Sequence, residues 1–339
     1  MVNDKCLLIN KNMETTNQNI ENTAAEEINA RIQDAANLLG EEDTDTIISG
    51  INALHRIAME CYKGGEEEQA YVEVINDIIC SYTRESTKII TIKKQKERKI
   101  CSYPAVIMQT IIDVLFKNKE NIYRRYWSNL TDVVFICMDF TEAHLTKVAF
   151  TEARLKHTKF NFARLTDVRF NRAKLNKVYF MCDTSLRFVR FDNASLMRTD
   201  FNNASLIDVS FNEANLRAKF QKAQLRRVAF NNASLLKAKF TGAQLVDVAF
   251  NEANLTNIEL NGAKLTRVAF NNAILTNTEI VRAILTNVSF CSATLINVRF
   301  KFDGFENSKA RFSTVNFSNT KLADKSDEKI IENAYELTK

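Results

Sequence analysis

One spacing rule governs more than half of this 339-residue chain: from Leu130 onward, a leucine or phenylalanine stands at almost every fifth position, up to Leu322. Two positions before these centres stand small or β-branched residues, among them Ala143, Val148, Ala153, Thr158 and Ala163. A period of five is neither the 3.6 of an α-helix nor the 2 of a β-strand. The pattern therefore indicates about 39 repeats of five residues, each with two apolar positions and a mostly polar remainder.

Three stretches of this region, "FNEANLT", "TGAQLVD" and "NGAKLTR", carry a recognisable motif. Through them, residues 130–322 resemble the pentapeptide-repeat family, whose motif is A(D/N)LXX. The resemblance implies a mainly β fold, a right-handed quadrilateral β-helix in which each pentapeptide forms one side and four form a coil. A coil of twenty residues explains why "VAF" returns at Val228, Val248 and Val268. We expect phenylalanine to stack on phenylalanine along two opposite sides, including Phe250 and Phe270, and leucine on leucine along the other two.

The register of the repeat changes twice. One extra residue stands between Phe180 and Leu186, and one is missing between Leu216 and Phe220. We expect a small bulge at the corner near residues 181–183, because a five-residue side cannot absorb a sixth residue without leaving the stack. We expect a tightened corner at residues 217–219.

Ahead of the repeats, apolar residues recur at helical spacing, as in "NTAAEEINARIQDAANLL" at residues 22–39. The pattern predicts a disordered N-terminus (1–21), a helical domain (22–84), a lysine-rich linker (85–103) and capping helices (104–129). After the repeats (130–322), "DKSDEKIIENAYEL" predicts a C-terminal helical cap within 323–339. The segment "GINALHRIA" is also similar to the HEAT-like helical region that precedes the repeats in a group of bacterial pentapeptide-repeat proteins.

Charge divides the chain into an acidic front and a basic body. Residues 130–322 hold 27 Lys and Arg against 16 Asp and Glu, a net charge of +11, whereas residues 1–129 hold 16 against 20. The cations gather on one side of the predicted β-helix, which nothing in the fold requires. The candidate interaction face consists of Arg154, Lys156, Lys174, Lys177, Arg198, Arg217 and Lys237.

Two further columns run along the predicted surface. One alternates in charge, which favours a structural ladder over a binding site: Lys147, Asp167, Arg187, Asp208, Arg227, Asp247 and Arg267. The other holds small residues, which either ease coil stacking or form a docking surface for a partner or a second subunit of a homodimer: Ala149, Ser210, Ala229, Ala249, Ala269 and Ser289, with Asn231, Asn251 and Asn271 beside them.

The sequence offers little chemistry. Glycine is scarce, at seven residues, and no phosphate-binding glycine motif occurs. The histidines at positions 55, 144 and 157 and the seven scattered cysteines have no metal-ligand spacing. We therefore expect no catalytic residue, no cofactor and no metal, and a non-enzymatic protein. The odd number of scattered cysteines suits reduced thiols, and the sequence shows neither a membrane-spanning apolar run nor a secretion signal. Together these features predict a cytoplasmic, non-membrane location.

These features favour a scaffold that binds a partner protein through the β-helix surface and the helical domain. One alternative is contact of the basic face with nucleic acid or another polyanion. We expect an acidic protein surface ahead of nucleic acid, because the face lacks exposed aromatic residues on which bases could stack. A second alternative comes from the family, whose best-known members imitate DNA and bind type II topoisomerases. That mimicry requires a negative rod, which the charge of +11 disfavours.

Overall fold

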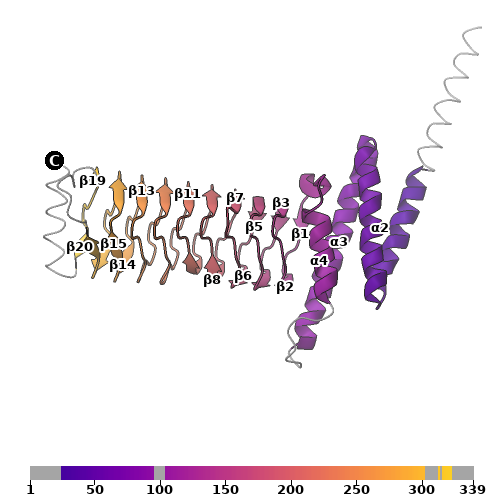
Figure 1. Cartoon of the computed structure of the whole chain (residues 1–339), viewed down its shortest axis with the longest axis horizontal. Coiled ribbons are helices and arrows are strands. Elements are labelled where there is room, and N and C mark those ends of the chain that lie inside the picture. The colour runs from indigo at the N-terminus through magenta and orange to yellow at the C-terminus, as the bar shows by residue number, and fades with distance from the viewer. Residues whose placement is uncertain (1–23, 95–103, 302–311, 314, 323–339) are drawn as a thin grey trace, which may run out of the picture. The chain divides into compact units, whose positions relative to one another are not determined.

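The computed structural model describes residues 24–94, 104–301, 312–313 and 315–322 (Figure 1). The described residues fall into two compact units, which divide between Tyr82 and Thr83. The N-terminal segment 1–21, for which the sequence predicts disorder, lies outside the described residues, as does the predicted C-terminal cap at 323–339.

The first unit is helical. A helix over residues 24–37 leads into the 3-10 turn η1 (Leu38–Gly40), followed by α2 (Thr44–Lys63) and the first part of α3 (Glu66–Lys94). The Asp43 carboxylate begins α2 by accepting a hydrogen bond from the Thr46 backbone N at 2.8 Å, as an N-cap residue does. Gly50 permits close helix packing, because a Cβ at this position would lie 2.9 Å from the Ala35 carbonyl oxygen.

Helix α3 extends ten residues into the segment 85–103, for which the lysine-rich composition predicts a linker. No glycine or proline interrupts the chain between Glu66 and Lys94, so nothing ends the helix earlier. Lys88 and Glu85 also form an ion pair of 2.9 Å along it. The next helix, α4 (Pro104–Phe116), begins at a proline, which is tolerated in a first turn. The 3-10 turn η2 (Ile122–Arg125) follows.

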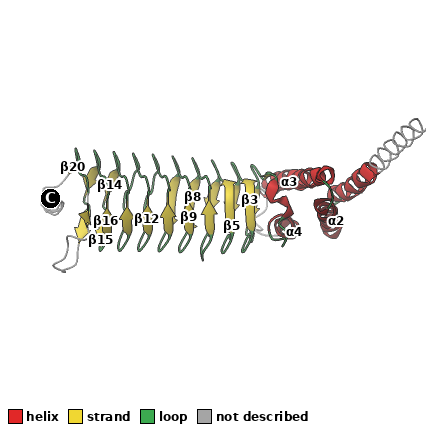
Figure 2. Ribbon diagram, turned by 90° about the horizontal axis from the view of Figure 1, so that it is seen from above, coloured by secondary structure: helices red, strands yellow, loops and turns green. Residues whose placement is uncertain are grey.

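The second unit is the right-handed quadrilateral β-helix that the sequence predicts, with short parallel strands joined by tight corners (Figures 1 and 2). One sheet has ten strands: β1 (Ser128–Asn129), β3 (His144–Ala149), β5 (Arg164–Arg169), β7 (Ser185–Arg187), β9 (Ser205–Ile207), β11 (Gln224–Arg226), β12 (Gln244–Val246), β13 (Lys264–Thr266), β16 (Ile284–Thr286) and β19 (Phe312–Ser313).

A second sheet has five strands: β2 (Val134–Ile136), β4 (Arg154–Lys156), β6 (Lys174–Asn176), β8 (Ser195–Asp200) and β10 (Asn215–Lys219). A third sheet contains β14 (Ile274–Thr276), β17 (Thr294–Ile296) and β20 (Lys321–Leu322), and a fourth pairs β15 (Glu279–Val281) with β18 (Arg299–Lys301). The pairing places each centre on its equivalent in the next coil, as Leu145 on Leu165. The twenty-residue coil predicted from the sequence is confirmed.

Two columns of stacked phenylalanine rings fill the core. Phe230 lies 4.9 Å from Phe250, with ring planes 4° apart, and Phe250 lies 5.0 Å from Phe270. Rings from the two columns meet edge to face, as Phe230 and Phe240 do at 6.0 Å and 90°. These side chains are fully buried, so each contributes roughly 1.5–3 kcal/mol of transfer free energy to stability. The predicted stacking of phenylalanine on phenylalanine is confirmed.

A residue with positive φ turns nearly every corner, two positions after the centre, as His157, Lys177 and Arg198 do with φ of 54°, 55° and 58°. At the first register change two such residues follow each other, Cys182 and Asp183, so the extra residue forms the predicted bulge. At the second change no residue between Leu216 and Phe220 has positive φ. Strand β10 runs through this position instead, and its register against β8 shifts between residues 217 and 219.

Helix α4 lies against the first coil of the β-helix. The Gln109 side-chain amide donates to the Asp139 carbonyl oxygen at 2.8 Å and accepts from the Asp139 backbone N at 3.0 Å. The Phe116 ring lies 6.0 Å from Phe140, the first ring of its column. The helix therefore satisfies strand-edge backbone groups and covers apolar side chains that an open coil would expose.

Candidate interaction surface

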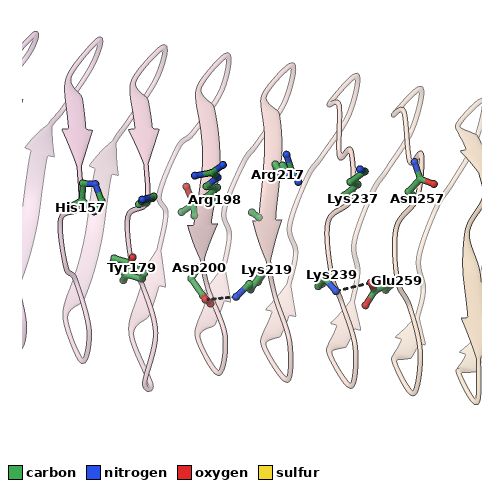
Figure 3. Close-up of a pocket in the computed structure, with 13 residues that line it drawn as sticks. His157, Tyr179, Arg198, Asp200, Arg217, Lys219, Lys237, Lys239, Asn257 and Glu259 are labelled. Carbon is green, nitrogen blue, oxygen red and sulfur yellow. Dashed lines mark hydrogen bonds and ion pairs between the residues drawn. The ribbon is translucent and has the colours of Figure 1, made fainter.

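A groove of about 690 Å³ runs along one corner of the β-helix, between the side that contains β4, β6, β8 and β10 and the side that follows it (Figure 3). Its first wall, which we call the corner row, contains His157, Lys177, Arg198, Arg217, Lys237 and Asn257. Its second wall, which we call the strand row, contains Tyr179, Asp200, Lys219, Lys239 and Glu259. Both rows take one residue from each successive coil. Arg217 is the exception to exact register, because it pairs with Met197 and stands one position before the place of the missing corner residue.

The two rows differ in how their charges are balanced. In the strand row, Lys219 Nζ lies 3.6 Å from Asp200 Oδ2, and Lys239 Nζ lies 2.7 Å from Glu259 Oε1. In the corner row, Lys177, Arg198, Arg217 and Lys237 form no ion pair with any residue that the structure describes. The groove therefore keeps four uncompensated positive charges.

The electrostatic environment of His157 reflects this excess of positive charge. Partial desolvation, together with the positive charges of Lys177 and Lys156, lowers the pKa of the His157 imidazole below its ordinary value of 6.5. Like charges disfavour a further proton on a neighbouring group. An anion in the groove would reverse this effect, so His157 is a natural reporter of anion binding.

The missing corner residue shapes the middle of the groove. Because no residue with positive φ projects between Leu216 and Phe220, the groove floor is formed there by Ala218, which is 2% exposed. The corner positions on the neighbouring coils hold Arg198 and Lys237, and Arg217 comes directly before the floor residue (Figure 3). Three cations thus flank the place where one coil lacks a corner residue.

The structure divides the seven predicted face residues into two groups. Lys177, Arg198, Arg217 and Lys237 line the groove. Arg154 and Lys174, which are register partners on β4 and β6, and Lys156 are exposed on the strands of the same side, outside the groove lining. The seven residues therefore form a groove and an adjoining basic strand surface.

The strand row was not predicted from the sequence. Tyr179, Asp200 and Lys219 stand directly before the phenylalanine centres of the following side. The residue type at this position changes from coil to coil between aromatic, acidic and basic, and this variation was the signal that the sequence offered. Tyr179 also corrects the expectation that the basic face lacks a nearby aromatic residue, because its partly exposed ring lines the groove. Predicting the strand row would have required knowing how residues on two adjoining sides of the β-helix face each other.

The alternating-charge column forms ion pairs at another corner. Arg227 contacts Asp208 with both Nε (2.6 Å) and an Nη (2.7 Å), and Arg267 contacts Asp247 in the same way at 2.5 and 2.9 Å. The hydrogen bonds to Arg227 lower the pKa of the Asp208 carboxyl below its ordinary value. Arg187 does not belong to this column, because it comes one residue after Leu186, and the corner position there is taken by Phe188, which is 52% exposed.

The small-residue column lies on the next side. Ser210, Ala229, Ala249 and Ala269 bridge one another across successive coils. The asparagines beside them are occupied with backbone groups: Asn251 N donates to Asn231 Oδ1, and Asn271 N donates to Asn251 Oδ1, each at 3.3 Å. This ladder supports the structural interpretation of the asparagines and leaves the homodimer surface a prediction.

Among the described residues, no group of three or more His, Cys, Asp or Glu side chains is placed to hold a metal ion. Within the same residues, no helix combines the length and the apolar character that crossing a membrane requires.

Comparison with protein families identifies the repeat. The model of the pentapeptide repeat region matches residues 184–260. The model of pentapeptide repeats (8 copies) matches residues 126–161, 149–181, 243–279 and 253–290. Together these matches cover both walls of the groove. No curated protein sequence matches the chain.

Solved structures that resemble the chain include three pentapeptide-repeat proteins. HetL from Nostoc sp. strain PCC 7120, involved in heterocyst differentiation regulation, has 20% identity and a TM-score of 0.29, covering 57% of this chain and 86% of its own. Trypsin-treated QnrB1, a plasmid-mediated fluoroquinolone resistance protein, has 14% identity and a TM-score of 0.31, covering 61% and 96%. A protein of the Arabidopsis thaliana thylakoid lumen has 24% identity and a TM-score of 0.25, covering 34% and 75%.

Proposed function

Because this chain belongs to the pentapeptide-repeat family, whose models match residues 126–181 and 184–290, we propose that it is a non-enzymatic scaffold that binds an acidic protein partner. The groove is the principal docking surface, and the helical unit supplies a second one. The observation that carries this proposal is the set of four corner-row cations without an ion pair among the described residues.

The contrast with the other charged corner supports this interpretation. There the fold places Asp208 beside Arg227 and Asp247 beside Arg267, so equivalent positions can be neutralised within the chain. Exposed like charges on neighbouring coils repel each other, so the cations of the corner row lower the stability of the folded protein slightly. A partner with complementary negative charge would relieve the repulsion and accelerate association.

Binding of a nucleic acid is the second candidate. It is supported by the same cations and by Tyr179, which offers one aromatic ring for stacking. Two carboxylates, Asp200 and Glu259, stand in the same groove and would oppose a continuous phosphate backbone. DNA mimicry toward a topoisomerase is the least favoured candidate, because residues 130–322 carry 27 basic against 16 acidic residues.

We further propose that the protein works in the cytoplasm. Cys61, Cys182 and Cys291 are free thiols, the state that a reducing compartment maintains. Measurement of thiol reactivity in intact cells with a membrane-permeant alkylating reagent tests this location. Modification before lysis is expected for Cys182 and Cys291, which are partly exposed, and their recovery as disulfides would contradict it.

Affinity capture from native-host extract tests the scaffold proposal. The bait is the full chain or its variant K177E/R198E/K237E, and the matched control R164E/R190E/K264E reverses three exposed cations outside the groove. We expect an acidic protein that the control retains and the groove variant loses. Equal recovery on both variants would contradict docking through the groove. Titration with DNA and RNA at about 50 and 200 mM salt separates the second candidate, since phosphate contacts weaken steeply over that range.

A further inference from the structure

We infer that the groove recognises one face of an α-helix in the partner, on which aspartate or glutamate side chains recur at i, i+3 and i+4 spacing. This inference rests on the proposed function, because it names the chemical group and the secondary structure that the same groove would receive. It follows from the spacing of the corner-row cations, from the shape of the groove floor and from the position of the strand-row carboxylates.

The spacing of the cations favours a helix over an extended strand. Lys177, Arg198, Arg217 and Lys237 come from four successive coils, and hydrogen-bonded strands lie ~4.8 Å apart. An α-helix parallel to the stack presents one face again after each turn of ~5.4 Å. Alternate residues of an extended strand recur only every ~6.7 Å.

The mismatch over the whole row makes the difference clear. Across three coil intervals a helix drifts by ~2 Å from the cations, which flexible lysine and arginine side chains can follow. An extended strand drifts by ~6 Å over the same length, so its carboxylates and the cations fall out of register. One carboxylate per helical turn can therefore meet one cation per coil.

The groove floor fits a convex ligand at its centre. The coil that lacks a corner residue brings the inward-facing Ala218 to the groove lining, next to Thr199, which holds the equivalent inward position on the preceding coil and is also buried. Arg198, Arg217 and Lys237 surround this low point. A carboxylate at the middle of a helical face would enter it and reach arginine groups from two coils, the kind of contact that guanidinium groups make best.

The strand row explains why a row of separate carboxylates suits the groove better than a phosphate chain. Asp200 and Glu259 hold Lys219 and Lys239, so negative charge already stands on the second wall. A helix with acidic residues on one face turns neutral or basic residues toward that wall. A nucleic acid backbone carries charge at every unit and would meet both carboxylates.

A designed peptide provides the direct test. The probe is a fluorescein-labelled, capped alanine- and glutamine-based helix of about 20 residues with glutamates at positions i, i+4, i+7 and i+11, which share one face. The comparison peptide has the same composition, with its four glutamates spaced by five residues and therefore distributed around the helix. Fluorescence anisotropy with the full-length protein gives both affinities at about 50 mM salt, where exposed charge pairs are weakly screened.

We expect the first peptide, whose four glutamates share one face and which we call the one-face peptide, to bind more tightly than the comparison peptide by about fivefold or more. The variant R198E/R217E/K237E should weaken that binding at least about tenfold, whereas the control R164E/R190E/K264E should change it less than about twofold. Circular dichroism and thermal melting verify that each variant is folded; these side chains are all exposed, so no loss of structure is expected.

Three outcomes would overturn the inference. Equal affinity of the two peptides would contradict the inference that the carboxylates lie on one face of a helix. The scaffold proposal would still stand in that case if the groove variant lost the captured partner. An equal loss of peptide affinity in the groove variant and the control variant would show that the groove is not the binding site. Tighter binding of single-stranded DNA than of the one-face peptide at about 200 mM salt would replace the acidic helix with a nucleic acid.

Discussion

Lys239 Nζ and Glu259 Oε1, from successive coils, lie 2.7 Å apart inside the groove, and each side chain is about 40% exposed (41% and 38%). This pair neutralises one end of the strand row, while Lys237, two residues earlier in the chain, faces the same groove without a carboxylate partner among the described residues. Neutralised and uncompensated cations therefore stand side by side, which makes the groove charge adjustable by single substitutions.

Removing the carboxylate should strengthen binding of an acidic ligand. We expect Glu259→Gln to raise the affinity for the one-face peptide by about two- to fivefold, because Lys239 becomes available and a repulsive charge disappears. The matched control Glu252→Gln removes an exposed carboxylate that lies outside the groove lining and should have little effect. Unchanged or weaker binding by Glu259→Gln would contradict the assigned polarity of the groove.

His157 should report the charge of its surroundings. Since Lys177 helps to hold the pKa of the imidazole below 6.5, Lys177→Met should raise that pKa, whereas Lys174→Met, on the neighbouring strand, should leave it nearly unchanged. Saturating acidic peptide should raise it in the unmodified protein by adding negative charge. NMR titration of the His157 Cε1 proton measures all three. An unchanged pKa of His157 at saturating peptide would show that the ligand does not approach this end of the groove.

Phenylalanine stacking should dominate the stability of the second unit. Phe230→Ala removes a fully buried ring that stacks on Phe211 at 4.8 Å and on Phe250 at 4.9 Å, so we expect a loss of about 3–5 kcal/mol. Phe188→Ala removes a ring that is 52% exposed and should cost less than about 0.5 kcal/mol. Urea unfolding followed by far-UV circular dichroism compares them; equal costs would contradict the assigned core.

The ion pair of Asp208 with Arg227 should make stability depend on acid pH. The folded protein lowers the pKa of Asp208 below the ordinary 3.8, so the pair stabilises the folded state above that value. The contribution disappears as the pH falls through the lowered pKa. Asp208→Asn should thus be less stable than the unmodified protein at pH 7, and the difference should shrink as the pH falls below 3.8 through the lowered pKa. Asp167→Asn, at an equivalent corner without an ion pair among described residues, is the control; a pH-independent difference would contradict the electrostatic assignment.

The sequence predicts the β-helix well because one repeated spacing determines which side chains point inward. Once the resemblance to the pentapeptide-repeat family was recognised, Leu145 and Phe150 could be placed in the core from their positions in the repeat, and the two register changes could be located to within three residues. The extent of α3 was less accessible, because the lysine-rich composition of residues 85–94 indicates solvent exposure and does not separate an exposed helix from a linker.

The groove could be predicted only in part. Lys177, Arg198 and Lys237 follow from the register of one side, and Arg217 was found as a cation close to that column. The strand row comes from a different side, and the hollow at Ala218 depends on a lost corner residue together with a small side chain. Neither follows from one column of the repeat. The ion pairs that separate neutralised from uncompensated cations depend on side-chain geometry across two coils.

Mapping of the bound peptide onto the protein by NMR tests the central claim most directly. Backbone amide shifts of the isotope-labelled full-length chain are followed as the one-face acidic peptide is added. The account predicts that the largest changes occur together at residues 177, 198, 217–219 and 237–239, the two walls around the shortened corner. Changes concentrated on the strands of another side, such as β11 and β13, or no changes at saturating peptide, would contradict it.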